Sequence, residues 1–156
     1  AAFERHVPEP WRLVLAGSDG YGADEIRARI EASPARDRIE TPGWVGAEEL
    51  EALYRQASVF AFPSLDEGFG IPVLEAMAHG VPVISSNRPA LAEACGKAAM
   101  LVDPLDQEAL TEGLRRLVCN PTLREHLIAG GRQQAAQFSW ERAVENTWRV
   151  YRELSG

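Results

Sequence analysis

The chain has 156 residues, of which 46% are hydrophobic and 25% charged, and its formal net charge is −7. This length fits one domain with a buried core, and the ordinary share of charged residues excludes a globally disordered chain. The acidic balance excludes a broad basic surface for nucleic acid, and no run of apolar residues reaches the roughly 18 that a membrane span needs.

Short apolar runs alternate along the chain with segments of helical periodicity. The apolar runs predict buried strands at 12–16 and 58–63, and further strands at 38–45, where Pro42 and Gly43 weaken the pattern, at 81–85 and at 99–102. Apolar positions three and four apart predict helices at 23–31, 48–57, 71–79, 89–94, 105–118, 121–137 and 139–154. Gly80 is placed to end the helix 71–79, and Ser139 to cap the last helix with Glu141 in its first turn. Strands separated by helices predict an α/β fold, in which helices cover both faces of a parallel sheet.

In such folds, ligands bind at the carboxyl ends of the strands, so we expect a site built from the loops 17–22, 43–46, 63–70 and 85–89. The first of these loops has the spacing G-x-x-G-x-G and not the G-x-G-x-x-G of a nicotinamide site, which makes that function a remote alternative.

The segment 63–80 (PSLDEGFGIPVLEAMAHG) carries the strongest chemical signal. Gly68 and Gly70 allow a ligand to approach the backbone, and the N-terminus of the following helix suits a pyrophosphate. Glu67 and Glu75 flank this anion site and would accept hydrogen bonds from sugar and ribose hydroxyls. The same spacing also fits a glycine turn before an amphipathic helix with two surface glutamates. His79, in the last turn of that helix, is expected to be structural.

The run Glu67-Gly68-Phe69-Gly70-Ile71-Pro72-Val73-Leu74-Glu75-Ala76-Met77 resembles the signature of the retaining GT-B glycosyltransferases of the "group one" family. Further segments that are similar to this family, in the same order, are 43–46, 61–64, 80–84, 101–104 and 138–140. The segment 85–93 (SSNRPALAE) is similar to a variant in mannosyltransferases of bacterial polysaccharide assembly. The resemblance covers nearly the whole chain and implies a Rossmann-like three-layer sandwich, the C-terminal half of a GT-B fold.

The resemblance also implies a role for each matching residue. Glu67 would bind hydroxyls of the donor sugar as the catalytic-site carboxylate, and Glu75 would bind the ribose hydroxyls. The other implied donor-binding residues are Trp44, Val45, Ser64, Gly68, Phe69, Gly70, Ile71, Val73 and Leu74. Trp44 and Val45 would lie against the base, and Ser64 near the base or Glu67. No metal and no cofactor is implied, because this class neutralises the leaving diphosphate with protein groups.

The family's first strand, the Arg and Lys that grip the diphosphate, and the N-terminal acceptor domain have no match in this chain. We expect residues 1–6 to continue the helix after that missing strand. We also expect the resulting gap in the sheet to be filled by another chain or segment, including self-association, or closed by direct pairing of the strands around Val14 and Phe60. Trp140 and Trp148 lie on one helix face, which favours core packing; the alternative is that one of them is exposed here, because in the family this helix also packs toward the N-terminal domain.

The expected function is therefore that of a donor-binding domain for a nucleoside-diphosphate sugar, with GDP-mannose as the expected donor. The full-length enzyme would pass the sugar to an acceptor glycan or lipid through its N-terminal domain, and this chain alone would be inactive. The alternative is a non-catalytic nucleotide-sugar-binding or interaction module of the same fold. Cys95 and Cys119 show no disulfide or metal spacing and are expected to be buried thiols in the cytoplasm. The full-length enzyme is expected in the cytoplasm, including at the inner face of the membrane.

Overall fold

A computed structural model describes residues 2–20 and 22–155, so Tyr21 of the loop 17–22 and Ala1 of the expected N-terminal helix lie outside the described residues. The strands are β1 (Leu13–Ala16), β2 (Ile39–Gly43), β3 (Phe60–Phe62), β4 (Val83–Ser86) and β5 (Met100–Val102). The helices are α1 (Ala2–His6), α2 (Ala23–Glu31), the 3₁₀ helix η1 (Arg36–Arg38), α3 (Ala47–Gln56), α4 (Ile71–Ala78), α5 (Pro89–Cys95), α6 (Gln107–Cys119), α7 (Pro121–Ala135) and α8 (Trp140–Leu154). The alternation of strands and helices confirms the α/β fold class.

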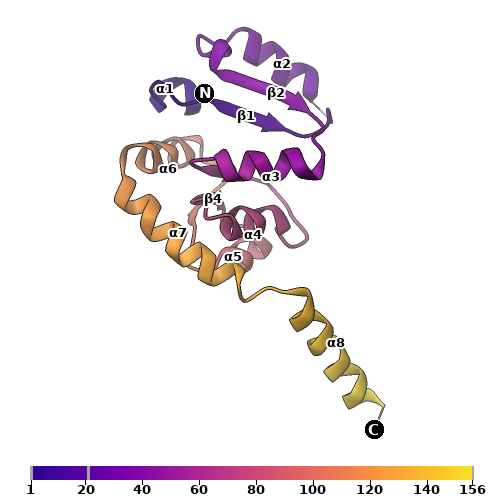
Figure 1. The fold of residues 1–156 in the computed structure, drawn as a ribbon. Helices are drawn as coiled ribbons and strands as arrows, with labels where there is room; N and C mark the ends of the chain where they lie inside the picture. Colours follow the sequence, from indigo (N-terminus) through magenta and orange to yellow (C-terminus); the bar gives the residue numbers. More distant parts are fainter. Residues whose placement is uncertain (1, 21, 156) are drawn as a thin grey trace.

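The strands form two separate parallel sheets. One sheet pairs β1 with β2, and the other has the order β3-β4-β5. Helix α3 lies between the two sheets (Figure 1). The expectation that the strands around Val14 and Phe60 pair directly is therefore wrong. Filling of this place by another chain or segment, including self-association, stays a prediction.

The division of the sheet leaves β1 less covered than expected. Val14 and Leu15 are each 39% exposed, whereas all four residues of β4 are buried. The prediction of a buried strand at 12–16 is therefore wrong, because β1 has a paired neighbour on one side only. By contrast, β4 has a strand on each side and helices on both faces.

The larger sheet has an apolar cluster on each of its faces. Val83 packs with Val73 and Met77 of α4 and with Leu91 of α5, while Ile84 packs toward α6 and α7. The two side chains point to opposite faces because they are adjacent in one strand. Helices therefore cover this sheet on both sides, as the three-layer prediction requires.

Helix α8 extends away from the rest of the chain (Figure 1). Ser139 caps it as predicted, because its Oγ accepts a hydrogen bond from the Arg142 amide at 3.3 Å. Hydrogen bonds from its own amide and from Ser139 lower the pKa of the Glu141 carboxyl. Trp140 and Trp148 are 78% and 60% exposed, so the prediction of core packing is wrong for both. In the described ranges, no helix has the length and apolarity to cross a bilayer.

Candidate functional site

The site predicted from the sequence is centred on the loop 63–70 and the first turn of α4. Gly70 is the N-cap of α4 and has a φ of +102°, in the region that disfavours a side chain. A Cβ at this position would lie 2.6 Å from Cδ2 of Leu91 in α5. Glycine is therefore required here for two reasons, the backbone conformation and the close approach of α5. Pro72 lies in the first turn, where a missing N–H costs nothing.

The start of α4 leaves a set of backbone amides free. The carbonyl oxygen of Gly70 accepts the amides of Val73 and Leu74 at 3.1 and 3.4 Å, so these two N–H groups are engaged within the helix. Within the described part of the chain, no acceptor is found for the amides of the four preceding non-proline residues, Gly68, Phe69, Gly70 and Ile71. The free N–H donors thus come from the loop 63–70, called the glycine loop below, and from the first helical residue, Ile71.

The helix tip is open to solvent in part, because Gly70 is buried against Leu91 while its neighbours are exposed. Gly68 is exposed, and Phe69 and Ile71 are 43% and 52% exposed. The amides of Gly68, Phe69 and Ile71 therefore belong to exposed residues, whereas the amide of Gly70 belongs to a buried one. Free amides at a helix N-terminus, together with the helix dipole, favour a bound anion.

Glu75 lies one turn into α4 and has a polar partner that the sequence did not reveal. The hydroxyl of Tyr54 lies 3.2 Å from Oε2 of Glu75 and 3.3 Å from the carbonyl oxygen of Pro72. Burial of Tyr54, together with the negative charge of Glu75 and this hydrogen bond, raises the pKa of the phenol. Tyr54 therefore remains a donor at neutral pH and fixes one oxygen of an otherwise exposed carboxylate. The periodicity of α3 predicted only that Tyr54 would face the core.

Glu67 and Ser64 lie in the loop that precedes the tip. Glu67 is half-buried, and its carboxylate makes no hydrogen bond or ion pair with any other described residue. Ser64 donates to the carbonyl oxygen of Asp66 at 3.1 Å, so its hydroxyl stabilises the turn and does not bind Glu67. The Glu67 side chain is thus available to an external hydrogen-bond donor.

Trp44 and Val45 follow β2. Trp44 is 76% exposed, and Val45 is half-buried. The amide of Gly17 donates to the carbonyl oxygen of Gly43 at 2.8 Å, which joins the loops after β1 and β2. Helix α3 begins just beyond Trp44 and Val45 and carries Tyr54 to Glu75. The exposed indole of Trp44, between β2 and α3, offers a flat surface on which an aromatic ring could stack.

His79 is the C-cap of α4. Its Nδ1 lies 2.9 Å from the carbonyl oxygen of Glu75, and its ring stacks on Tyr54 with 5.3 Å between centroids. This environment agrees with the predicted structural role.

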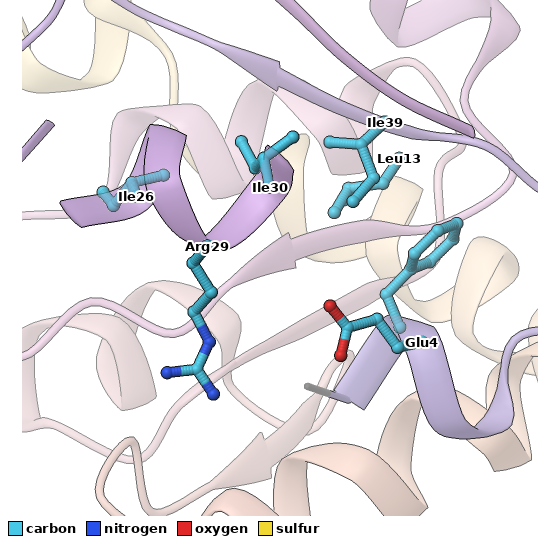
Figure 2. A pocket seen from close by; sticks show the side chains of 7 residues that line it. Glu4, Leu13, Ile26, Arg29, Ile30 and Ile39 are labelled. Atoms are coloured by element: carbon cyan, nitrogen blue, oxygen red, sulfur yellow. The ribbon is translucent and has the colours of Figure 1, made fainter. Parts of the chain in front are cut away.

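A second concave region lies on the other sheet, between α1, α2 and the strands β1 and β2 (Figure 2). Its apolar lining consists of Phe3, Leu13, Ile26, Ile30 and Ile39. Glu4 and Arg29 add two opposite charges, and a hydrogen bond with Ser33 lowers the pKa of the Glu4 carboxyl. It contains no residue of the glycine loop, so it is separate from the predicted site.

The described residues contain no cluster of three or more His, Cys, Asp or Glu side chains that could hold a metal ion. Of the two cysteines, Cys95 is buried but Cys119 is exposed, so the expectation of two buried thiols is wrong for Cys119. Cys119 is the last residue of α6, at the surface end of the helix.

Comparison with known proteins is consistent across sequence and structure. The family model for "Glycosyl transferases group 1" matches residues 2–134. The chain is 38% identical over 142 residues to O-antigen chain mannosyltransferase B of Escherichia coli, covering 91% of this chain and 37% of the relative. It is 40% identical over 119 residues to an MMP alpha-(1->4)-mannosyltransferase of Mycolicibacterium hassiacum, covering 74% of this chain and 29% of the relative. The chain therefore spans about a third of the length of these relatives.

Two solved structures show the same fold. Sucrose-phosphate synthase from Thermosynechococcus elongatus matches with a TM-score of 0.81 and 32% identity, over 92% of this chain and 38% of that chain. The C-terminal domain of LpcC, a group 1 family glycosyl transferase from Francisella tularensis, matches with a TM-score of 0.76 and 23% identity, over 87% of this chain and 74% of that chain. The second match shows that the fold is that of a C-terminal glycosyltransferase domain.

Proposed function

Because the chain belongs to the glycosyl transferases group 1 family, we propose that it is the nucleotide-sugar-binding half of a retaining glycosyltransferase. The observation that carries this proposal is the start of α4: amides without an acceptor follow the unpaired Glu67 in the loop, and Glu75, oriented by Tyr54, lies one turn into the helix. This arrangement fits an anionic diphosphate that carries a hydroxyl-rich group at each end.

Each group at the tip has a task that its environment supports. The amides of Gly68, Phe69, Gly70 and Ile71 would donate to the donor's diphosphate and sugar, with the buried Val73 and the half-buried Leu74 holding the first turn in place. Glu67, which has no protein partner, would accept hydrogen bonds from hydroxyls of the transferred sugar. Glu75 would accept the ribose hydroxyls while Tyr54 holds its other oxygen. Charge-assisted hydrogen bonds of this kind are strong and directional.

Trp44 and Val45 are proposed to contact the base. The exposed Trp44 indole and the half-buried Val45 follow β2 and lie just before α3, the helix that carries Tyr54 to Glu75. Ser64 supports the loop indirectly through its bond to Asp66.

The donor is proposed to be GDP-mannose, because two relatives with the names of mannosyltransferases share 38% and 40% identity with this chain. Transfer would keep the anomeric configuration and would rest on electrostatic stabilisation of the departing diphosphate, without a metal. No described residue has been assigned to bind the acceptor. We therefore propose that acceptor binding and transfer need regions that the longer relatives contain beyond the matched segment, and that this chain alone binds the donor without turnover.

Titration calorimetry tests the proposal with GDP, UDP, GDP-mannose and UDP-glucose, and with NADH as the ligand expected not to bind. Glu75→Ala should weaken GDP binding by about 1–3 kcal/mol, because charge-assisted hydrogen bonds to the ribose are lost. Glu125→Ala is the matched control, since Glu125 is an exposed carboxylate on α7. Equal GDP affinity in the Glu75 variant and the wild type would reject the ribose role.

Glu67→Gln separates the sugar from the nucleotide. The variant should bind GDP-mannose more weakly than the wild type and bind GDP equally well, because GDP lacks the transferred sugar whose hydroxyls Glu67 would accept from. The reverse pattern would place Glu67 at the nucleotide. If a polypeptide that joins this chain to the regions its longer relatives contain beyond the match binds the donor but transfers no sugar to any acceptor, the non-catalytic binding module becomes the better description.

A further inference from the structure

The glycine loop has few hydrogen bonds of its own. Within the described ranges, its side-chain hydrogen bonding consists of Ser64 to the carbonyl oxygen of Asp66, and the amides from Gly68 to Ile71 have no acceptor. A segment with two glycines in three residues is conformationally free unless packing restrains it. Side-chain contacts must therefore hold the loop where its amides can meet a ligand.

Two contacts provide this restraint. Gly70 lies against Leu91 of α5, as described above. Phe69 meets Phe138 edge to face, with 5.7 Å between ring centroids and 74° between the ring planes. Phe69 carries the only side chain between Gly68 and Gly70. Its ring contact with Phe138 is therefore the side-chain contact that restrains this part of the backbone.

Phe138 is itself held by the end of α7. Its amide donates to the carbonyl oxygen of Ala135 at 3.0 Å. One residue earlier on α7, Gln134 donates through Nε2 to the carbonyl oxygen of Ala94 in α5 at 2.9 Å. Helix α5 therefore supports both contacts of the loop, directly at Gly70 and through α7 at Phe69. Every described residue from 139 onward is exposed, so this restraint ends at Phe138.

We propose that Phe138 is a positioning residue of the donor site: it holds Phe69, and thereby the free amides of Gly68, Phe69 and Gly70, in the arrangement that receives the donor. This inference rests on the proposed function of the loop. It assigns Phe138 a role in ligand binding that its distance in sequence from Glu67 and Glu75 does not suggest.

The binding test uses the whole chain and titration calorimetry with GDP and UDP. Phe138→Ala should weaken the better-bound diphosphate about three- to tenfold, as expected for loss of one aromatic pair. Phe138→Tyr should restore most of the affinity, because it keeps the ring. Trp140→Ala is the matched control, since Trp140 is an aromatic residue two positions away that is 78% exposed, and it should bind as the wild type does.

A double-mutant cycle shows whether Phe138 acts through Phe69. In a Phe69→Ala background, Phe138→Ala should cause little further loss, because its partner ring is already absent. If the double variant lost affinity by the product of the two single-variant factors, the proposal would be overturned. Wild-type affinity in Phe138→Ala would overturn it as well.

A ligand-free measurement separates this inference from the proposed function. The heteronuclear NOE of the Phe69 and Gly70 amides should fall in Phe138→Ala and stay at the wild-type value in Trp140→Ala, while amides within α4 remain rigid in both. If the wild-type chain bound neither diphosphate, the proposed function would fail, and the NOE would still decide whether Phe138 orders the loop. Unchanged loop NOE values in Phe138→Ala would refute the positioning role.

Discussion

Gly70→Ala perturbs the helix tip at a single atom. The new Cβ would lie 2.6 Å from Cδ2 of Leu91, closer than real Cβ contacts, and the residue would have to keep a φ of +102°. Backbone strain of this kind costs about 1–3 kcal/mol, and overpacking a buried site costs about 1–3 kcal/mol more. We therefore expect the free energy of unfolding to fall by about 2–6 kcal/mol. That is a large part of the roughly 5–15 kcal/mol that stabilises a typical domain.

Urea denaturation followed by far-UV circular dichroism measures this change. Gly68→Ala is the matched control, because a Cβ at Gly68 would have no atom within 4 Å and its φ is not positive. It should change the free energy of unfolding by no more than about 0.5 kcal/mol.

The packing part of the cost can be tested separately. Leu91→Ala alone should cost about 2–5 kcal/mol by leaving a cavity. In the double variant the alanine at position 70 finds that space open, so the two costs should sum to more than the observed loss. A Gly70→Ala chain within about 1 kcal/mol of the wild type would refute the reasoning, since neither the φ nor the contact with α5 would then constrain the tip.

Two further predictions concern titratable side chains. Burial raises the pKa of the Cys95 thiol to about 11. Iodoacetamide at pH 8 should therefore label the exposed Cys119 in the folded chain and Cys95 only after unfolding, as mass spectrometry would detect. Rapid labelling of Cys95 in the native chain would contradict this prediction. The raised pKa of Tyr54 contributes stability that is fully present below the usual phenol pKa of about 10 and is lost as the pH rises above it, because the unfolded chain ionises first. Urea midpoints measured between pH 9 and pH 11 should therefore fall less steeply in Tyr54→Phe than in the wild type, and equal slopes would count against the buried phenol.

The local features of the site followed from short-range rules and could be predicted. Gly70 before Pro72 indicated a helix start, and the structure begins α4 at the residue between them. Ser139 indicated the start of α8 for the same kind of reason, since a cap bonds to an amide three residues on. Such features depend on a few neighbouring residues, so the sequence contains all the information they need.

Contacts between distant segments could not be predicted in this way. The periodicity of α3 predicted that Tyr54 would be buried, but not that its hydroxyl would reach Glu75. The contact between Phe69 and Phe138 joins residues that are far apart in the chain, and no pattern in either segment indicates the other. Burial also depended on neighbours: an apolar run predicted β1 as a buried strand, yet Val14 is exposed because one side of the strand has no pairing partner.

The order of strands and helices, the glycine-hinged tip of α4 and the family resemblance could all be derived from the chain's residues in order, because propensity, capping and motif spacing act within a few residues. Which edges pair, which apolar faces stay exposed and which side chains contact the loop before α4 depend on the tertiary structure. These outcomes depend on how separate elements meet in space, and a one-dimensional pattern specifies the face that an element would bury but not the partner that covers it.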